Sequence, residues 1–191
     1  MARPRLVSDD VILDATRQVL AELGPAKLTL AAVGSRAGLA PPTLMQRFGS
    51  KRGLLLASAA RSPRLVLRAA EEAEARNTSP LAALRDFARS AVAHIKHREG
   101  NAFVQFDDAE FRHHAVAHSA AVVDNCVRFY RAAVEAGELR PDTDVPALAR
   151  HTLVCLTGAL HVWAVNGWGS LPDFLTEQLD LMLAPYLRTG A

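Results

Sequence analysis

The chain has 191 residues, half of them hydrophobic and 22% of them charged. It holds 35 Ala and 26 Leu against only 27 residues of Val, Ile and Thr together, a composition that favours helices over sheets. A chain of this length buries roughly 70% of its unfolded surface when it folds. We therefore expect a folded, all-α protein and exclude an intrinsically disordered one.

The net charge of +2 hides an uneven distribution along the chain. Residues 1–60 carry eight cations and four anions, whereas the rest of the chain carries 14 cations and 16 anions. A basic first third followed by a near-neutral remainder indicates one part that faces a polyanion and another with a different task. Scatter among twelve charges is the alternative explanation.

Three features bear on the cellular compartment. Cys126 and Cys155 lie in apolar helical patterns, and we interpret them as reduced core residues of a cytoplasmic protein. The basic start of the chain meets Ser8, Asp9 and Asp10 without an apolar segment, so we expect no secretory signal. Residues 151–172 are uncharged, but their polar residues and turn-forming end favour a buried or interface helix over a membrane span.

Helical spacing and capping residues predict about nine helices and no strand. The first helix is expected to start after Ser8 and to end at Gly24 and Pro25. Two short helices follow over about 29–37 and 41–48. Later helices are expected over about 51–76, 81–97, 108–136, 145–165 and 172–187, with Pro63 either bending the first of these or starting another.

The first three helices have the pattern of a helix-turn-helix, with Gly38 in the turn between the second and third. The apolar set that would lock these two helices together is Leu30, Val33, Leu39, Leu44 and Phe48. This set leaves Thr43, Gln46 and Arg47 on the outer face of the third helix. A helix held in this way enters the major groove of DNA, where Arg reads guanine and Gln reads adenine.

At these residues the chain resembles the TetR family of transcriptional regulators. The similarity runs from Ile12 to Leu56 and includes Leu23-Gly24, Leu28-Thr29, Val33, Gly38-Leu39, Thr43-Leu44, Phe48 and Ser50-Lys51. The resemblance implies a helix-turn-helix DNA-binding domain over residues 1–55. It also implies a helical effector-binding and dimerisation domain over residues 56–191.

The same resemblance implies a function. We expect a homodimeric cytoplasmic regulator, a repressor that binds a pseudo-palindromic double-stranded DNA operator. A small, largely apolar effector would release it by changing the separation of the two DNA-binding domains. No catalytic, zinc or phosphate-binding motif appears in the sequence, so we expect neither an enzyme nor a cofactor.

The resemblance also assigns DNA contacts. Thr43 and Arg47 are expected to contact bases or phosphates, and Lys51 to contact a phosphate; Gln46 is added because of its exposed position. The chain departs from the family at Met45, where a Tyr that contacts the DNA backbone is usual. That hydrogen bond is lost.

The chain departs from the family at two further places, and its basic start has two interpretations. Pro41 and Pro42 remove two backbone donors at the start of the third helix, and Gly34 replaces a usual Ala at a helix cost of roughly 1 kcal/mol. Arg3 and Arg5 form either an arm that reaches DNA or an ordinary basic terminus.

Two residue sets are proposed for the second domain, with ordinary core packing as the alternative for each. The expected effector pocket comprises aromatic residues and histidines: Phe87, His94, Phe103, Phe106, His113, Phe129, His161 and Trp163. The expected dimer interface comprises the apolar stripes of the last two helices: Leu153, Leu156, Leu160, Leu175, Leu179, Met182 and Leu183.

Three alternatives concern a metal site, a protein that does not read DNA and a protein-binding co-regulator. His114 and His118 are four residues apart, as are metal ligands on one helix face, but no third ligand has matching spacing and we expect no metal site. Met45 and the two prolines motivate one rival, a helical carrier or enzyme that no longer reads DNA. A co-regulator that acts through protein contacts is the other.

Overall fold

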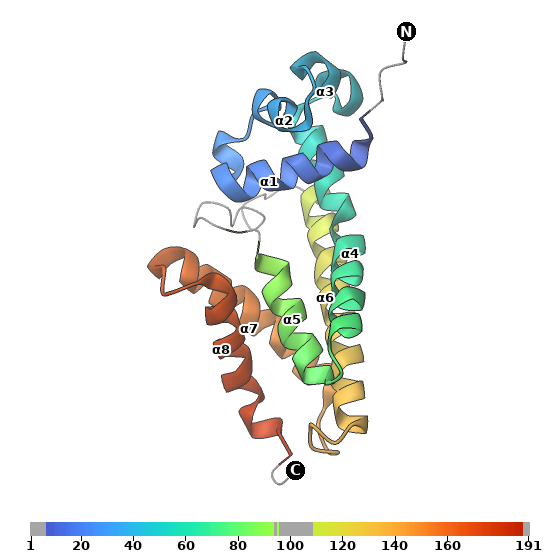
Figure 1. Cartoon of the computed structure of the whole chain (residues 1–191), viewed down its shortest axis with the longest axis vertical. Helices are drawn as coiled ribbons and strands as arrows, with labels where there is room; N and C mark the ends of the chain where they lie inside the picture. The colour runs from blue at the N-terminus through green and yellow to red at the C-terminus, as the bar shows by residue number, and fades with distance from the viewer. Residues whose placement is uncertain (1–6, 94, 96–108, 189–191) are drawn as a thin grey trace. The chain divides into compact units, whose positions relative to one another are not determined.

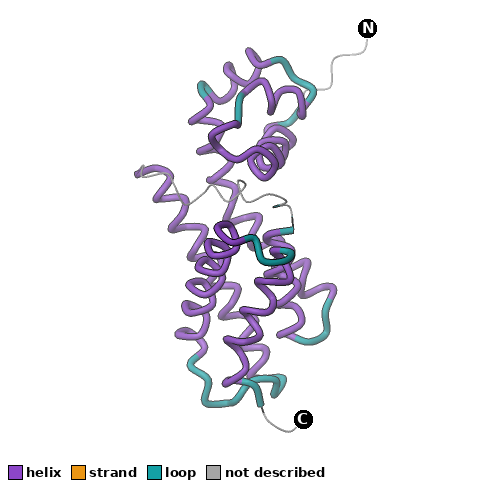
Figure 2. Tube along the Cα trace, turned by 90° about the vertical axis from the view of Figure 1, so that its left-hand side faces the viewer, coloured by secondary structure: helices purple, strands orange, loops and turns teal. Residues whose placement is uncertain are grey.

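The computed structural model describes residues 7–93, 95 and 109–188. These residues form helices joined by short connections, as the trace in Figure 2 shows. In chain order the α-helices are α1 (Asp9–Lys27), α2 (Leu30–Ala37), α3 (Pro41–Phe48), α4 (Lys51–Arg76), α5 (Pro80–Val92), α6 (Ala109–Glu135), α7 (Val145–Asn166) and α8 (Leu171–Leu183) (Figure 1). The described part contains no strand beyond an isolated bridge between Leu139 and Leu187. The predicted all-α fold class is confirmed.

Spatial contacts divide the chain into two compact units. The first unit comprises residues 1–61 and 95–114, and the second unit comprises residues 62–94 and 115–191. Both α4 and α6 therefore contribute residues to each unit. The domain boundary expected between residues 55 and 56 falls inside α4 and stays a prediction.

The helix ends of the first unit follow from local chemistry. Ser8 and Thr29 cap α1 and α2 because their hydroxyl oxygens accept hydrogen bonds from the backbone N–H groups of Val11 and Ala32. The regular helix is interrupted at Gly24, as expected, because Gly24 takes a non-helical conformation with φ 72°. A further helical segment then continues to Lys27.

The core of the first unit is built from the residues that the helical periodicity singled out. Its fully buried members include Ile12 of α1, Val33 of α2, Leu44 of α3 and Leu54 of α4, and Phe111 of α6 joins them. The third helix is thus fixed by one deeply buried side chain. Its opposite face remains available to solvent.

The second unit has its own core, in which α5, α7 and α8 pack beside the later parts of α4 and α6. The rings of Phe87 on α5 and Phe129 on α6 lie 5.7 Å apart, centroid to centroid. Beside them the buried Tyr130 hydroxyl lies 2.6 Å from the hydroxyl oxygen of Thr152 on α7. This contact satisfies two polar groups that would otherwise be costly to bury.

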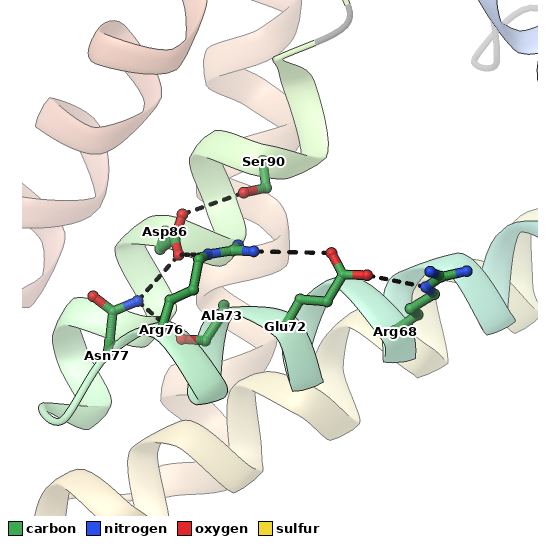
Figure 3. A network of polar contacts seen from close by, with 7 residues as sticks. All are labelled: Arg68, Glu72, Ala73, Arg76, Asn77, Asp86 and Ser90. Atoms are coloured by element: carbon green, nitrogen blue, oxygen red, sulfur yellow. Dashed lines mark hydrogen bonds and ion pairs between the residues drawn. The ribbon is translucent and has the colours of Figure 1, made fainter.

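A polar network connects the end of α4 to α5 (Figure 3). Asp86 accepts hydrogen bonds from the Arg76 guanidinium at 2.9 Å, the Asn77 amide at 3.0 Å and the Ser90 hydroxyl at 3.3 Å. These donors, Arg76 first among them, hold the pKa of Asp86 below its usual value. Glu72 lies on the other side of Arg76 and pairs with it and with Arg68 along α4.

The sequence left open how Pro63 affects α4, and it showed an uncharged segment that forms much of α7. Pro63 does not start a new helix, because α4 continues through it to Arg76. In the described part, α7 alone is long and apolar enough to cross a membrane by length and composition. It packs against α8 along one face, with Leu148, Ala149 and Trp163 among its buried residues. Its other face carries exposed apolar side chains, Val154 and Val165 among them.

Candidate nucleic-acid interface

The turn between α2 and α3 depends on two glycines. Gly38 ends α2 in the left-handed region, with φ 69°, where a residue without a side chain is favoured. The Leu39 N–H then donates to the Gly34 carbonyl oxygen at 2.8 Å. A Cβ atom on Gly34 would lie only 2.5 Å from the Leu39 carbonyl oxygen, so the usual Ala does not fit here. The close approach explains why the chain has Gly34 where Ala is usual in the family.

The outer face of α3 is open to solvent. Pro41, Pro42 and Gln46 are exposed, and Met45 is 50% exposed, while Leu44 is fully buried. Thr43 is half-buried at the start of this face. The exposed side chains lie on the side away from the core, as a recognition helix requires.

The first turn of α3 offers little to an anion. Pro41 and Pro42 have no N–H group, and the N–H of Thr43 donates to the Ala40 carbonyl oxygen at 3.0 Å. No side chain caps this helix end. Phosphate contacts at α3 therefore have to come from side chains rather than from the helix end.

The first turn of α4 is different. The Ser50 hydroxyl accepts from the Gly53 N–H at 2.9 Å and so caps the helix. The first turn contains no acidic residue and begins with Lys51 and Arg52. Cations at the positive end of a helix are unfavourable unless an anion is nearby. Lys51, which the sequence predicted as a phosphate contact, thus lies at a helix end suited to phosphate.

Arg47 does not extend freely from the outer face of α3. Its guanidinium donates to the carbonyl oxygen of Val7 at 2.5 Å and pairs with the Asp9 carboxylate at 3.2 Å. The side chain is only 22% exposed. The expected base or backbone contact by Arg47 stays a prediction, and in the described conformation its hydrogen-bonding groups are engaged within the protein.

Other arginines hold the helices of the first unit in place. Arg36 on α2 pairs with Glu22 on α1 at 2.5 Å, and Arg61 on α4 pairs with Asp10 and Asp14 on α1. Together with the Arg47–Asp9 pair, these contacts engage all four anions of residues 1–60 inside the unit. The same pairs engage Arg36 and Arg47, so fewer cations of residues 1–60 are available to a polyanion than the sequence count suggests.

A contact that sequence reasoning missed lies at the start of α6. Arg52 pairs with Glu110 and its guanidinium lies 5.9 Å from the centre of the Phe111 ring. Phe111 is itself buried in the core of the first unit. The sequence shows Phe111 as an apolar residue and gives no signal for its contact with Arg52.

The predicted effector-pocket residues do not come together in one cavity. Phe87, Phe129 and Trp163 are buried in the core of the second unit, whereas His161 is exposed on α7. His113 belongs to the first unit, where it lines an open hollow of about 480 Å³ beside Leu56 and Glu110. His94, Phe103 and Phe106 lie outside the described residues. The pocket stays a prediction.

The predicted dimer-interface residues divide into two groups. Leu175, Leu179 and Leu183 are buried in their own chain because this face of α8 packs on α5 and α7, so they are not available to a second copy. Leu153, Leu156, Leu160 and Met182 are half-buried. The most exposed apolar side chains on these helices are Val154, Val162, Val165 and Leu181. The spacing of apolar residues could not distinguish the face of these helices that packs inside the chain from the face that is exposed, because both faces are apolar.

No cluster of three or more potential metal ligands occurs among the residues that the structure describes. His118 is not directed at such a site. Its Nδ1 atom lies 2.7 Å from the Ser62 hydroxyl oxygen.

Comparison with solved structures places this geometry in a wider group. The chain is similar to SmeT, the repressor of a Stenotrophomonas maltophilia multidrug efflux pump, with 24% identity, 97% of this chain and 93% of that chain covered, and a TM-score of 0.65. It is also similar to the regulatory protein TetR from Rhodobacter sphaeroides, with 21% identity, coverages of 95% and 100%, and a TM-score of 0.74. A third similar structure is the transcriptional regulator FadR from Bacillus subtilis, with 17% identity, 93% of this chain and 98% of that chain covered, and a TM-score of 0.68. No match was found among curated proteins.

The fold and the exposed third helix define an all-helical protein with an amino-terminal helix-turn-helix. Residues 12–58 match the family model of the bacterial regulatory proteins of the tetR family. Within residues 12–58 the chain therefore has the amino-terminal domain described for tetR-family regulatory proteins. The resemblance stated from the sequence is confirmed.

Proposed function

We propose that this protein is a ligand-responsive transcriptional repressor that binds a pseudo-palindromic operator as a homodimer. The observation that carries the proposal is the match of residues 12–58 to the TetR-family DNA-binding domain, combined with an α3 whose outer face is solvent-exposed. Two copies of α3 about 34–36 Å apart would meet successive major grooves on one side of the DNA.

In this proposal the DNA contacts come from two helices. Gln46 is exposed near the centre of α3 and reads a base edge in the major groove. Thr43 and Lys51 hold phosphates, the second from the positive amino-terminal end of α4. Met45, half exposed on the same face, offers an apolar contact in place of the usual tyrosine hydroxyl.

Homodimerisation would cover the exposed apolar face of the last two helices. Val154 is 67% exposed on α7, and Leu181 is 64% exposed on α8. On α7, Val154, Gly158, Val162 and Val165 recur at helical spacing on the exposed side. Exposed apolar stripes of this kind mark association surfaces, and a two-fold pairing of α7 and α8 would bury both.

The proposed effector is small and largely apolar. SmeT has been solved with triclosan and FadR from Bacillus subtilis with stearoyl-CoA. The second unit here offers aromatic side chains of the same apolar character, including Phe87 and Phe129. Opening a cavity beside them would require the core to rearrange around the ligand.

The two units are joined by continuous helices that would carry the signal. The α4 helix passes from one unit to the other beside Pro63, whose missing N–H leaves one carbonyl group of the preceding turn without its usual donor. Helices bend most easily at such a position. In the first unit, Phe111 and the Arg52–Glu110 pair fix the start of α6, so a shift of either helix would reach α3.

The test is selection of binding sites from random duplex DNA, followed by anisotropy titrations of the winning site at several salt concentrations. A palindromic site is the expected result. With six to ten phosphates neutralised, affinity should fall about 10³- to 10⁵-fold between 50 and 200 mM salt. Lys51→Ala removes two contacts from a dimer and should reduce the slope of log affinity against log salt by about two.

The matched control is Arg68→Ala, which removes an exposed cation from the second unit. This variant should bind the selected site with unchanged affinity and salt slope. If no sequence is enriched and the wild type binds weakly even at low salt, the proposal is wrong.

A further inference from the structure

The solvent-exposed face of α3 is made of uncharged side chains. Leu44 is fully buried and marks the side of the helix that faces the core. On the opposite side lie Pro42, Met45 and Gln46, because helical residues three and four positions apart share a face. All three are exposed. This surface, which we call the reading face of α3, therefore offers two apolar side chains and one amide.

Arg47, the single charged residue among the eight of α3, lies away from the reading face. It follows Leu44 by three residues and so lies nearer to the buried side of the helix. Its Nη1 atom donates to the Val7 carbonyl oxygen at 2.5 Å and lies 3.2 Å from the Asp9 carboxylate. A guanidinium reads guanine through two N–H groups directed outward at the O6 and N7 atoms of the base. Held against the start of α1, Arg47 does not present its side chain for that contact.

The groups on the reading face match the major-groove edge of an A·T pair. Thymine presents a C5-methyl group, which apolar side chains contact, and adenine presents an N7 acceptor and an N6 donor, which a Gln amide pairs with. Met45 is 50% exposed, and its flexible, polarizable thioether packs readily on an apolar group. A G·C pair presents no methyl group, and the reading face holds no cation for the acceptors of guanine.

We propose that α3 is specific for A·T pairs, with Met45 packed on a thymine methyl group and Gln46 hydrogen-bonded to an adenine. This inference rests on the proposed function and names the bases that α3 selects. Pro42 adds apolar surface beside Met45. Phosphate contacts come from residues outside the reading face, Lys51 among them, so base preference and salt dependence belong to different side chains.

The thymine contact is tested by removing methyl groups one at a time. The duplex selected from random DNA is synthesised again with deoxyuridine in place of single thymidines, a change that keeps base pairing and deletes only the C5-methyl group. We expect one position in each half-site at which this change weakens wild-type binding about fourfold, the effect of one buried methyl group. Changing both half-sites should weaken binding about fifteenfold.

Variants at position 45 assign this effect to Met45. Met45→Ala should bind the thymidine and deoxyuridine forms equally, whereas Met45→Leu keeps an apolar side chain and should keep the difference. Leu23→Ala removes a side chain of α1 that is 39% exposed and should respond as the wild type does. Thermal unfolding checks that each variant is folded. If no deoxyuridine position weakens wild-type binding, or if Met45→Ala stays sensitive, the thymine contact is wrong.

The adenine contact is tested with 7-deazaadenine, in which a C–H group replaces the N7 acceptor. One such base in each half-site should weaken wild-type binding about threefold to tenfold, and Gln46→Ala should bind the natural and modified duplexes equally. Equal loss in Gln46→Ala and the wild type would overturn this contact. Both Gln46→Ala and Met45→Ala should leave the slope of log affinity against log salt unchanged, unlike Lys51→Ala, because neither removes a phosphate contact.

The alternative, guanine readout by Arg47, is tested by repeating the selection with Arg47→Ala. This variant should select the same bases as the wild type, with any loss of affinity equal for all sequences. A G·C pair whose preference is relaxed in Arg47→Ala would show that Arg47 reads guanine, and it would overturn this inference while specific binding persists. Absence of specific binding by the wild type would instead overturn the proposed function.

Discussion

The backbone of Leu39 lies so close to Gly34 that no side chain fits between them. The Leu39 N–H donates to the Gly34 carbonyl oxygen at 2.8 Å, and a Cβ atom at position 34 would lie 2.5 Å from the Leu39 carbonyl oxygen. Both atoms of this conflict belong to the backbone, which cannot rotate away as a flexible side chain can. The turn that sets the angle between α2 and α3 therefore requires glycine at a helical position.

Gly34→Ala is expected to lower the stability of the protein although Ala is the better helix former. Overpacking of this kind costs about 1–3 kcal/mol, which outweighs the gain of roughly 1 kcal/mol in helix propensity. Urea unfolding followed by circular dichroism measures the difference. Ser35→Ala, at the exposed neighbouring position, is the control and should be neutral or slightly stabilising; equal stability of both variants would refute the steric argument.

Charge on the exposed face of α7 and α8 should prevent association. We expect Val154→Glu and Leu181→Glu to convert a dimer into monomers, because two carboxylates would be brought together in an apolar interface. Sedimentation equilibrium measures the mass directly. Val116→Glu places the same charge at a valine on α6 that is 64% exposed and should leave the mass unchanged. A monomeric wild type would contradict the expected homodimer.

The pair formed by His118 and Ser62 predicts a loss of stability in mildly acidic solution. Burial holds the pKa of His118 below its usual value of about 6.5. Below that pH the unfolded chain binds a proton more readily than the folded chain does, so folding becomes less favourable. The midpoint of thermal unfolding should therefore fall between pH 7.5 and 5.5.

The variant His118→Gln keeps a polar group beside the Ser62 hydroxyl but cannot titrate. Its unfolding midpoint should change less than that of the wild type over the same pH range. His151→Gln alters an exposed histidine on α7 and serves as the control, with a wild-type pH dependence. If the unfolding midpoints of His118→Gln and the wild type change identically with pH, burial of His118 is not the cause of the pH dependence of stability.

The Asp86 network predicts a second, more acidic transition. Because its hydrogen bonds hold the pKa of Asp86 below the usual value, Asp86 stabilises the fold above pH 4 or so, and this contribution is lost as the pH falls through the lower folded pKa. Asp86→Asn should lower stability by about 1 kcal/mol at pH 7, and by less at pH 3. The corresponding shift in unfolding midpoint is about 2–4 °C.

An exposed aspartate supplies the comparison for this prediction. Asp124 on α6 is exposed, and Asp124→Asn should have little effect at either pH. A constant difference between Asp86→Asn and the wild type from pH 7 to pH 3 would mean that the carboxylate charge is not what stabilises the end of α4.

Much of the first unit could be predicted from the sequence because its signals are local. Ser8 and Thr29 cap helices, Gly38 needs positive φ, and Leu30 and Val33 are spaced to share one face of α2. Each signal depends on residues within one or two helical turns. The helix-turn-helix and the exposure of Gln46 followed from these patterns.

Only the tertiary structure decided how side chains distant in sequence are used. Arg47 meets Val7 across forty residues, and Gly34 is required by a carbonyl group from the next turn. On α8 the sequence shows one apolar stripe, but packing against α5 and α7 buries Leu179 and leaves Leu181 exposed. Composition and spacing specify which residues can be buried; the arrangement of the neighbouring helices determines which of them are.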